Sequence, residues 1–406
     1  MRKIFFMGIT GWIMFFYFEN ESYSQDNSSN NFQLNTTSKM LISDKKLNIG
    51  GYGQIDYNQP FGGGTLQNGK LDVHRLILFV GYRFTNKLSF VSEIEIEHAS
   101  EIYIEQAFVN YAFNTYLNVR GGMLLIPVGV INLYHEPPTF NGVERPLIDK
   151  YIVPTTWREL GAGIAGSIPD ASLKYQFYVV GGFKSYDNGT AGLTGETGLR
   201  KGRQKGIEAI ITYPNFTARL DYYGILGLNL GLSAYFGKTQ STLFNGLDRN
   251  DPVAVQRADS SVVGISLAGF DLRYTRKGFH LRGQLYYSRI KNTEQYNYFT
   301  SEDNEPNDLG SSMYGYYIEV SYNVFYPFEK IKNKLVPFVR YSSYDTQATT
   351  AGDLPVNDAY QVNVITTGIG FWFIPQVAIK TDVQFLKNKI QSRYNYMFNA
   401  GIALMF

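Results

Sequence analysis

Residues 393–406 read RYNYMFNAGIALMF, and the alternation of their side chains indicates the fold. The even-numbered residues, from Tyr394 to Phe406, are all apolar or aromatic. The odd-numbered residues include Arg393, Asn395 and Asn399. Because successive side chains of a β-strand point to opposite faces, this stretch predicts a strand with one apolar face and one largely polar face.

The same alternation recurs along the chain and predicts sixteen strands. Within residues 87–98, for example, Ile94 lies between Glu93 and Glu95. Pro214 interrupts a further strand-like stretch, residues 206–213, and leaves the count open by one hairpin. The expected strands are residues 47–57, 71–84, 87–98, 102–113, 116–127, 160–168, 172–183, 215–224, 227–238, 262–276, 278–291, 312–325, 334–345, 360–373, 376–388 and 393–406.

The connections between these strands alternate in length. Short turns at residues 85–86 and 169–170, for example, alternate with long polar segments such as 128–159 and 184–214. Outer-membrane barrels have short periplasmic turns and long extracellular loops, whereas a soluble sandwich has no reason to follow this rule. The sequence therefore predicts an all-β fold, a transmembrane antiparallel up-and-down barrel whose apolar parity faces lipid.

The composition agrees with this class. Aromatic residues make up 16% of the chain and there are 40 glycines, yet only 44% of residues are hydrophobic. This is expected where apolar side chains occupy alternate positions only. The net charge of +2 excludes a polybasic nucleic-acid-binding protein, and the absence of cysteine excludes disulfides and thiolate chemistry. We expect no nucleic-acid partner and no cofactor.

The N-terminus has the pattern of a secretory signal peptide. Arg2 and Lys3 precede an apolar run at residues 4–18, and Ser22 and Ser24 form a small-x-small exit. The alternative, an N-terminal anchor helix, would have to cross about 30 Å of hydrocarbon with too short a run. We therefore expect a signal peptide at 1–24, a flexible periplasmic segment at 25–46 and an outer-membrane barrel at 47–406, in a Gram-negative bacterium.

The long connection at residues 128–159 is expected to fold into the lumen and narrow it. It contains four prolines together with aromatic residues, which favours an ordered loop over a disordered one. The alternative is an ordered cap outside the lumen. The expected constriction residues, from this loop and from the barrel wall, are Glu144, Arg145, Lys150, Arg158, Arg75 and Arg120.

The polar parity of the strands carries the charges expected to line the lumen. Ten bases against seven acids predict a mildly basic lumen, which would favour anions. In the alternative interpretation these charges pair with one another, as Arg219 with Asp221 or Asp271 with Arg273, and only keep the lumen wet. The bases are Arg75, Arg83, Arg120, Lys174, Arg219, Arg273, Arg282, Arg340, Lys380 and Arg393, and the acids are Glu93, Glu95, Glu97, Asp221, Asp271, Glu319 and Asp382.

Two further patterns concern other chemistries. Residues 161–166 match the dinucleotide fingerprint G-x-G-x-x-G, but a turn and a strand follow instead of a helix, so we interpret the glycines as part of a strand close to other backbone. A hydrolase would need a Ser/His pair, such as His98 or His135 with a rim serine, and no spacing places one together. The four histidines, at 74, 98, 135 and 280, show no metal-binding spacing.

Three stretches resemble the phosphate-selective porin O and P family in its Bacteroidetes-type form. They are Arg120-x-Gly122 through Pro127-x-Gly129, Glu144-Arg145-Pro146 followed by Trp157-Arg158-Glu159, and Arg219-Leu220-Asp221-Tyr222 followed by Gly227-Leu228. The resemblance implies a sixteen-stranded, commonly trimeric barrel with a loop in the lumen. Selective family members are similar in carrying a dense arginine ladder, which Glu93, Glu95 and Glu97 interrupt here.

These patterns predict a non-enzymatic outer-membrane porin for ion transport. It would pass small hydrophilic solutes by diffusion, with a weak preference for anions, phosphate among them. Expected partners are outer-membrane lipids, two further copies in a homotrimer and the barrel-assembly machinery, for which the terminal Phe406 resembles a recognition signal. The alternatives are a non-conducting structural or receptor barrel that partners a surface lipoprotein, and a membrane-embedded hydrolase.

Overall fold

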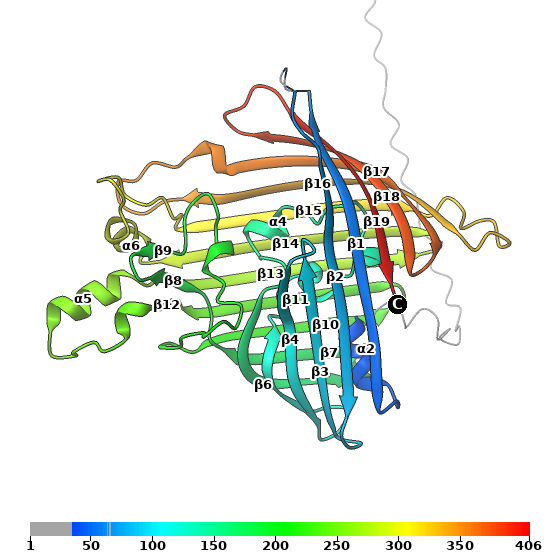
Figure 1. The fold of residues 1–406 in the computed structure, drawn as a ribbon, viewed down its shortest axis with the longest axis horizontal. Helices are drawn as coiled ribbons and strands as arrows, with labels where there is room; N and C mark the ends of the chain where they lie inside the picture. Colours follow the sequence, from blue (N-terminus) through cyan, green and yellow to red (C-terminus); the bar gives the residue numbers. More distant parts are fainter. Residues whose placement is uncertain (1–34, 63, 65) are drawn as a thin grey trace, which may run out of the picture. The chain divides into compact units, whose positions relative to one another are not determined.

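Sixteen strands close into one antiparallel barrel in the described part of the chain (Figure 1). The computed structural model describes residues 35–62, 64 and 66–406, so the expected signal peptide lies outside the described residues. Each strand pairs with the barrel strands before and after it, and β1 pairs with β19 to close the ring. The barrel strands are β1 (Leu47–Phe61), β2 (Lys70–Arg83), β3 (Leu88–Glu97), β4 (Glu101–Ala112), β5 (Asn118–Leu125), β6 (Arg158–Ile168), β7 (Leu173–Val180), β10 (Asn215–Ile225), β11 (Leu228–Lys238), β13 (Gly264–Arg276), β14 (Phe279–Lys291), β15 (Ser312–Tyr322), β16 (Lys334–Thr349), β17 (Gln361–Ile374), β18 (Val377–Asn388) and β19 (Asn395–Met405).

The predicted alternation of faces is confirmed. In β19, Phe398 and Ile402 are exposed on the outside, whereas Asn399 is fully buried and donates to Asp382 of β18 inside the barrel. One lumen residue was predicted wrongly: Arg393 is exposed in the loop before β19, because the strand begins two residues later than expected.

The glycines of residues 161–166 lie in β6, as the strand interpretation predicted. A Cβ atom on Gly163 would lie 2.0 Å from the backbone oxygen of Phe177 on β7. A Cβ atom on Gly166 would lie 1.9 Å from the backbone oxygen of Tyr116. The glycines therefore allow β6 to approach its neighbours closely, and no helix follows that would hold a pyrophosphate.

The two ends of the barrel differ, with most turns short at one end and long loops at the other. The long-loop end, on the left in Figure 1, carries α5, α6 and a small sheet of order β12-β8-β9. No helix among residues 35–62 and 66–406 is both long and apolar enough to cross a membrane. The elements outside the barrel wall are α2 (Thr36–Ile42), α3 (Val130–Leu133), α4 (Ile148–Tyr151), α5 (Pro252–Ser260), α6 (Thr293–Phe299), η1 (Pro137–Thr139), η2 (Pro169–Ala171), η3 (Arg200–Gly202), η4 (Thr242–Phe244), η5 (Asp358–Tyr360), β8 (Lys184–Asp187), β9 (Thr190–Ala191) and β12 (Gln240–Ser241).

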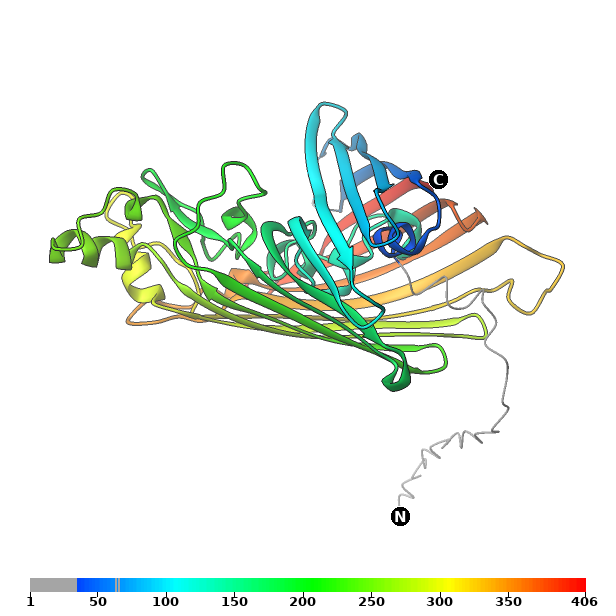
Figure 2. The same cartoon turned by 90° about the horizontal axis from the view of Figure 1, so that it is seen from below.

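Helix α2 lies in the segment that was expected to be a flexible lead-in, residues 25–46, of which 35–46 are described. Asn35 caps the helix by accepting from the backbone N–H of Ser38, at 2.9 Å. Arg83, at the short-turn end of β2, donates to the backbone oxygens of Leu41 and Ser43. The helix is therefore docked at the short-turn end of the barrel, where it is drawn in blue in Figure 2.

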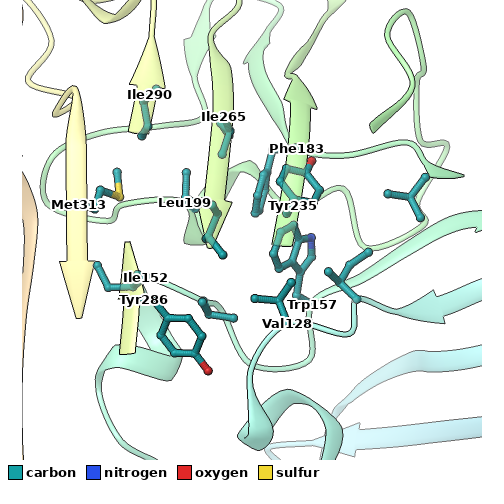
Figure 3. Close-up of a cluster of buried hydrophobic side chains, with 14 of the residues drawn as sticks. Val128, Ile152, Trp157, Phe183, Leu199, Tyr235, Ile265, Tyr286, Ile290 and Met313 are labelled. Atoms are coloured by element: carbon teal, nitrogen blue, oxygen red, sulfur yellow. The ribbon is translucent and has the colours of Figure 1, made fainter. Parts of the chain in front are cut away.

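The largest apolar core lies inside the barrel, where residues 126–157, here called the inward loop, meet the wall. Trp157 is fully buried and stacks on Phe183, with ring centroids 4.5 Å apart, and against Tyr235 at 4.7 Å (Figure 3). Ile152 of the loop packs in the same cluster as Met313 of β15. This core holds the inward loop in place, as expected for an ordered loop.

Candidate pore site

The inward loop lies inside the lumen, as predicted, and is bonded to well-separated parts of the wall. The backbone N–H of Val130 donates to Gln284 of β14 at 2.8 Å, and that of Val143 donates to Asp382 of β18 at 2.7 Å. His135 lies against Glu93 of β3, at 3.0 Å. A cap outside the barrel would not make these contacts, so that alternative is excluded.

Lys380 of β18 is the main cationic anchor of the inward loop. Its ammonium group is buried and donates to three backbone oxygens, those of Pro137, Phe140 and Gly142. The same group lies 4.3 Å from the ring centroid of Phe140. Since buried backbone oxygens need a donor, this one side chain satisfies three groups that helix or sheet structure leaves unpaired.

Other predicted lumen charges are also engaged with the inward loop. Glu319 accepts from Asn141 at 3.0 Å and pairs with Arg340 at 3.1 Å. Arg282 donates to the backbone oxygen of Thr139 at 2.8 Å. The guanidinium of Arg273 lies over the ring of Tyr134, 4.0 Å from its centroid.

The predicted pairing alternative holds for the charges on β10 and β13. Arg219 is buried between Asp221, at 2.6 Å, and Asp271, at 2.7 Å. The expected partnership of Asp271 with Arg273 is replaced by the contact of Arg273 with the loop. Lys174 lies over Tyr223 at 5.2 Å. Most lumen charges thus fasten the loop or one another, and do not face open solvent.

A cavity of about 470 Å³ remains between the inward loop, strands β1–β4 and residues 200–205. Its lining is rich in cations. The lining bases are Lys70, Arg75, Arg145, Lys150, Arg158, Arg200, Arg203 and Lys205, and the lining acids are Glu95, Glu97, Glu144 and Asp149.

The structure brings five of the six predicted constriction residues to this cavity. Only Arg120 is placed elsewhere: it donates to Asn110 and to the hydroxyl of Tyr178, both at 3.0 Å, and does not line the cavity. The sequence reasoning missed Lys70 and the cations of residues 200–205. The run RKGRQK at 200–205 was a usable signal, but nothing in the sequence showed that its loop turns inward.

The cavity is more positive than its residue types indicate. Burial raises the pKa of Asp149 to about 8, although a hydrogen bond from Gln284 opposes the shift, so this carboxyl is mostly uncharged at neutral pH. Burial, followed by the nearby Arg200 and Arg158, lowers the pKa of Arg203. Cations that lie close enough to repel one another favour a bound anion, because an anion relieves that repulsion.

The histidines pair with carboxylates. His74 lies 2.7 Å from Asp56, and His98 lies 2.5 Å from Asp72. Burial alone would lower the pKa of His135, but Glu93 and Glu105 raise it well above its usual value. The hydroxyl of Ser100 donates to the backbone oxygen of His98 and not to its ring. The described residues therefore give no support to the Ser/His arrangement that a hydrolase needs.

The comparisons with known proteins agree with a porin fold. The chain is 32% identical over 384 residues to an uncharacterized protein of Aquifex aeolicus, covering 91% of this chain and 82% of that protein. The chain belongs to the same family as that protein. No family model matches the chain, so the resemblance to the phosphate-selective porin O and P family is not confirmed.

Solved structures show the same architecture at low identity. The outer membrane channel DcaP of Acinetobacter baumannii matches with a TM-score of 0.57 and 12% identity, covering 89% of this chain and 97% of that one. An anion-selective porin from Comamonas acidovorans matches with a TM-score of 0.55 and 15% identity, covering 89% and 99%. The fold is thus that of outer-membrane porins.

Proposed function

We propose that this protein is an outer-membrane channel through which small hydrophilic solutes diffuse, with a preference for anions. The observation that carries the proposal is the cavity beside the inward loop, which eight lysine and arginine side chains line against four acidic ones. Rings of Arg and Lys favour anions in pores, because they replace part of the hydration of a passing anion and repel cations.

The acids in the same cavity limit how strong the preference is. Glu95 lies 3.7 Å from Arg75, and Glu144 accepts from Asn58 at 3.0 Å. Both lower the local positive potential, whereas Asp149 contributes little charge at neutral pH. We therefore propose a weak, general anion preference in which phosphate is one accepted solute. The similar fold of an anion-selective porin supports this proposal without establishing it.

The test is reconstitution of the purified chain in a planar bilayer. We expect discrete conductance steps and, in asymmetric potassium chloride, a reversal potential of the sign that marks chloride permeation. Titration with phosphate is expected to reduce the chloride current, because both anions would occupy the same cavity. A silent bilayer would contradict the channel, and a cation-type reversal potential would contradict the anion preference.

A second candidate function is a closed barrel with a structural or receptor role. The observation in its favour is the filling of the lumen: the inward loop is bonded across the barrel, and Thr36 of α2 donates to Glu136 of that loop at 2.7 Å. The bilayer recording separates the two candidates. If conductance appears only after residues 35–43 are deleted, helix α2 closes the barrel in its resting state.

We also propose that the channel acts as a homotrimer in the lipid of the outer membrane, after export by a cleaved signal peptide and insertion by the barrel-assembly machinery. The porin fold and the resemblance noted in the sequence support this assembly. Cross-linking in native membranes, with the products separated by size, tests the trimer. Mass determination of the mature N-terminus tests cleavage after Ser24.

A further inference from the structure

Three ionisable side chains from separate elements meet inside the barrel, beneath the basic cavity. They are Glu93 on β3, Glu105 on β4 and His135 on the inward loop, and all three are buried. Their nitrogen and oxygen atoms lie within 4.8 Å of one another. The Nε2 atom of His135 lies 3.0 Å from Glu93 and 3.4 Å from Glu105.

Glu105 is the feature that protein contacts leave unexplained. It is completely buried, and neither of its carboxylate oxygens has a hydrogen-bond partner. Its only ion-pair neighbour among the described residues is His135. Burying a carboxylate without hydrogen bonds is costly, so the position calls for a further positive group.

The surrounding contacts orient the three side chains as metal ligands are oriented. The Nδ1 atom of His135 lies 3.0 Å from the backbone oxygen of Asn132, a contact that fixes the proton on Nδ1 and leaves Nε2 to face the carboxylates. Gln106 donates to Glu93 at 2.6 Å, and Tyr52 donates to its other oxygen at 3.3 Å. Such outer contacts hold ligating side chains in place.

We propose that Glu93, Glu105 and His135 bind a divalent transition-metal ion that fastens the inward loop to the barrel wall. Ligand atoms about 2.0–2.1 Å from a tetrahedral ion lie roughly 3.4 Å apart, which matches the two nitrogen-to-oxygen distances. One imidazole with two carboxylates suits Zn²⁺, Fe²⁺ or Mn²⁺ better than Ca²⁺ or Mg²⁺, which prefer oxygen ligands alone. Water would complete the coordination.

The nearest arginines do not substitute for the ion. Arg75 forms its ion pair with Glu95, and Arg145 donates to the backbone oxygen of His135. Neither forms an ion pair with Glu93 or Glu105 in the described part of the chain. Glu95, whose carboxyl neighbours that of Glu105, lines the basic cavity, so the cluster lies directly beside water-accessible space.

The test uses Co²⁺ as a spectroscopic probe on the full chain, refolded in detergent and stripped of metal with a chelator. We expect the visible absorption bands of four-coordinate Co²⁺ to appear with one equivalent and to disappear when Zn²⁺ is added. Glu105→Gln and His135→Gln should each weaken Co²⁺ binding at least about tenfold. His98→Gln is the matched control, since this histidine also pairs with a carboxylate but lies outside the cluster.

Absence of Co²⁺ bands from the unmodified chain would overturn the proposal. Bands that persist unchanged in Glu105→Gln, or that vanish in His98→Gln instead, would overturn it as well. If the cluster variants fail to fold, as judged by heat-modifiable migration on gels, crystals of the unmodified chain soaked in Zn²⁺ decide. Anomalous scattering should then show an ion bonded to Nε2 of His135, and a peak elsewhere or none would refute the site.

Discussion

Replacing two cations of the cavity, in the double variant Lys150→Gln/Arg158→Gln, is expected to weaken the anion preference without disturbing the fold. Both residues line the cavity. Lys150 is exposed to it, and Arg158 donates one hydrogen bond, at 3.2 Å to the backbone oxygen of Thr156, while its Nε atom has no partner. Neither forms an ion pair in the described residues, so the substitutions leave no buried acid unpaired.

The magnitude follows from the size of the cavity. A sphere of about 470 Å³ has a radius near 5 Å, which places the wall charges roughly 8 Å from a solute at its centre. At that distance in water and about 10 mM salt, each charge contributes about 0.4 kcal/mol to the energy of a monovalent ion. Because anions and cations respond with opposite sign, each charge removed should lower the anion-to-cation permeability ratio about fourfold, and the pair about 15-fold.

The assay is the reversal potential under a salt gradient, measured at about 10 mM and about 1 M salt. The ratio should fall by the stated factor at low salt and change little at high salt, because screening shortens the reach of the wall charges. Arg120→Gln is the matched control: it removes a lumen arginine that does not line the cavity. An unchanged ratio in the double variant, or an equal change in the control, would refute the cavity as the selective element.

Three other changes test the anchoring of the loop, the titration of the cavity and the packing of the wall. Lys380→Met removes the donor to three backbone oxygens, so the free energy of unfolding in detergent should fall by about 3 kcal/mol and the conductance should rise, whereas Lys387→Met on the same strand should change neither. The folded-state pKa of Asp149, about 8, exceeds its unfolded value, so stability should fall as pH rises from about 4 to about 8, and anion preference should fall as the carboxyl ionises above about pH 8; Asp149→Asn should abolish both trends in pH titrations of unfolding and reversal potential. Gly163→Ala would place a Cβ atom 2.0 Å from the backbone of β7 and should reduce the folded fraction on heat-modifiability gels, while Gly121→Ala, whose Cβ atom would meet only Ala162 at 3.8 Å, should fold normally.

The strands and their faces could be predicted because they depend on local pattern. Period-two alternation in segments such as residues 393–406 reflects a barrel wall that has lipid on one side and the lumen on the other. The predicted strands agree with the observed ones apart from their ends, as the late start of β19 and the exposed Arg393 show. The position of the inward loop was also predictable, since four prolines in a long connection are typical of an ordered segment.

The roles of the lumen charges could not be predicted from parity. Parity placed Lys380 inside the barrel but could not show that its ammonium group binds the backbone of the inward loop. Arg120 and Arg158 are equivalent by sequence reasoning, yet only Arg158 reaches the cavity. What a lumen charge faces depends on where a loop far away in the chain crosses the barrel.

The sequence by itself determined the barrel, the number of its strands and the parity that faces the lumen, because these follow from alternation between neighbouring residues. Only the tertiary structure decided which charges remain open to solutes and which are used to hold the loop. It also brought Glu93, Glu105 and His135 together from two strands and a loop, although no spacing in the chain connects them. Selectivity and metal binding depend on contacts across the lumen, and a barrel makes such contacts between residues that are distant in sequence.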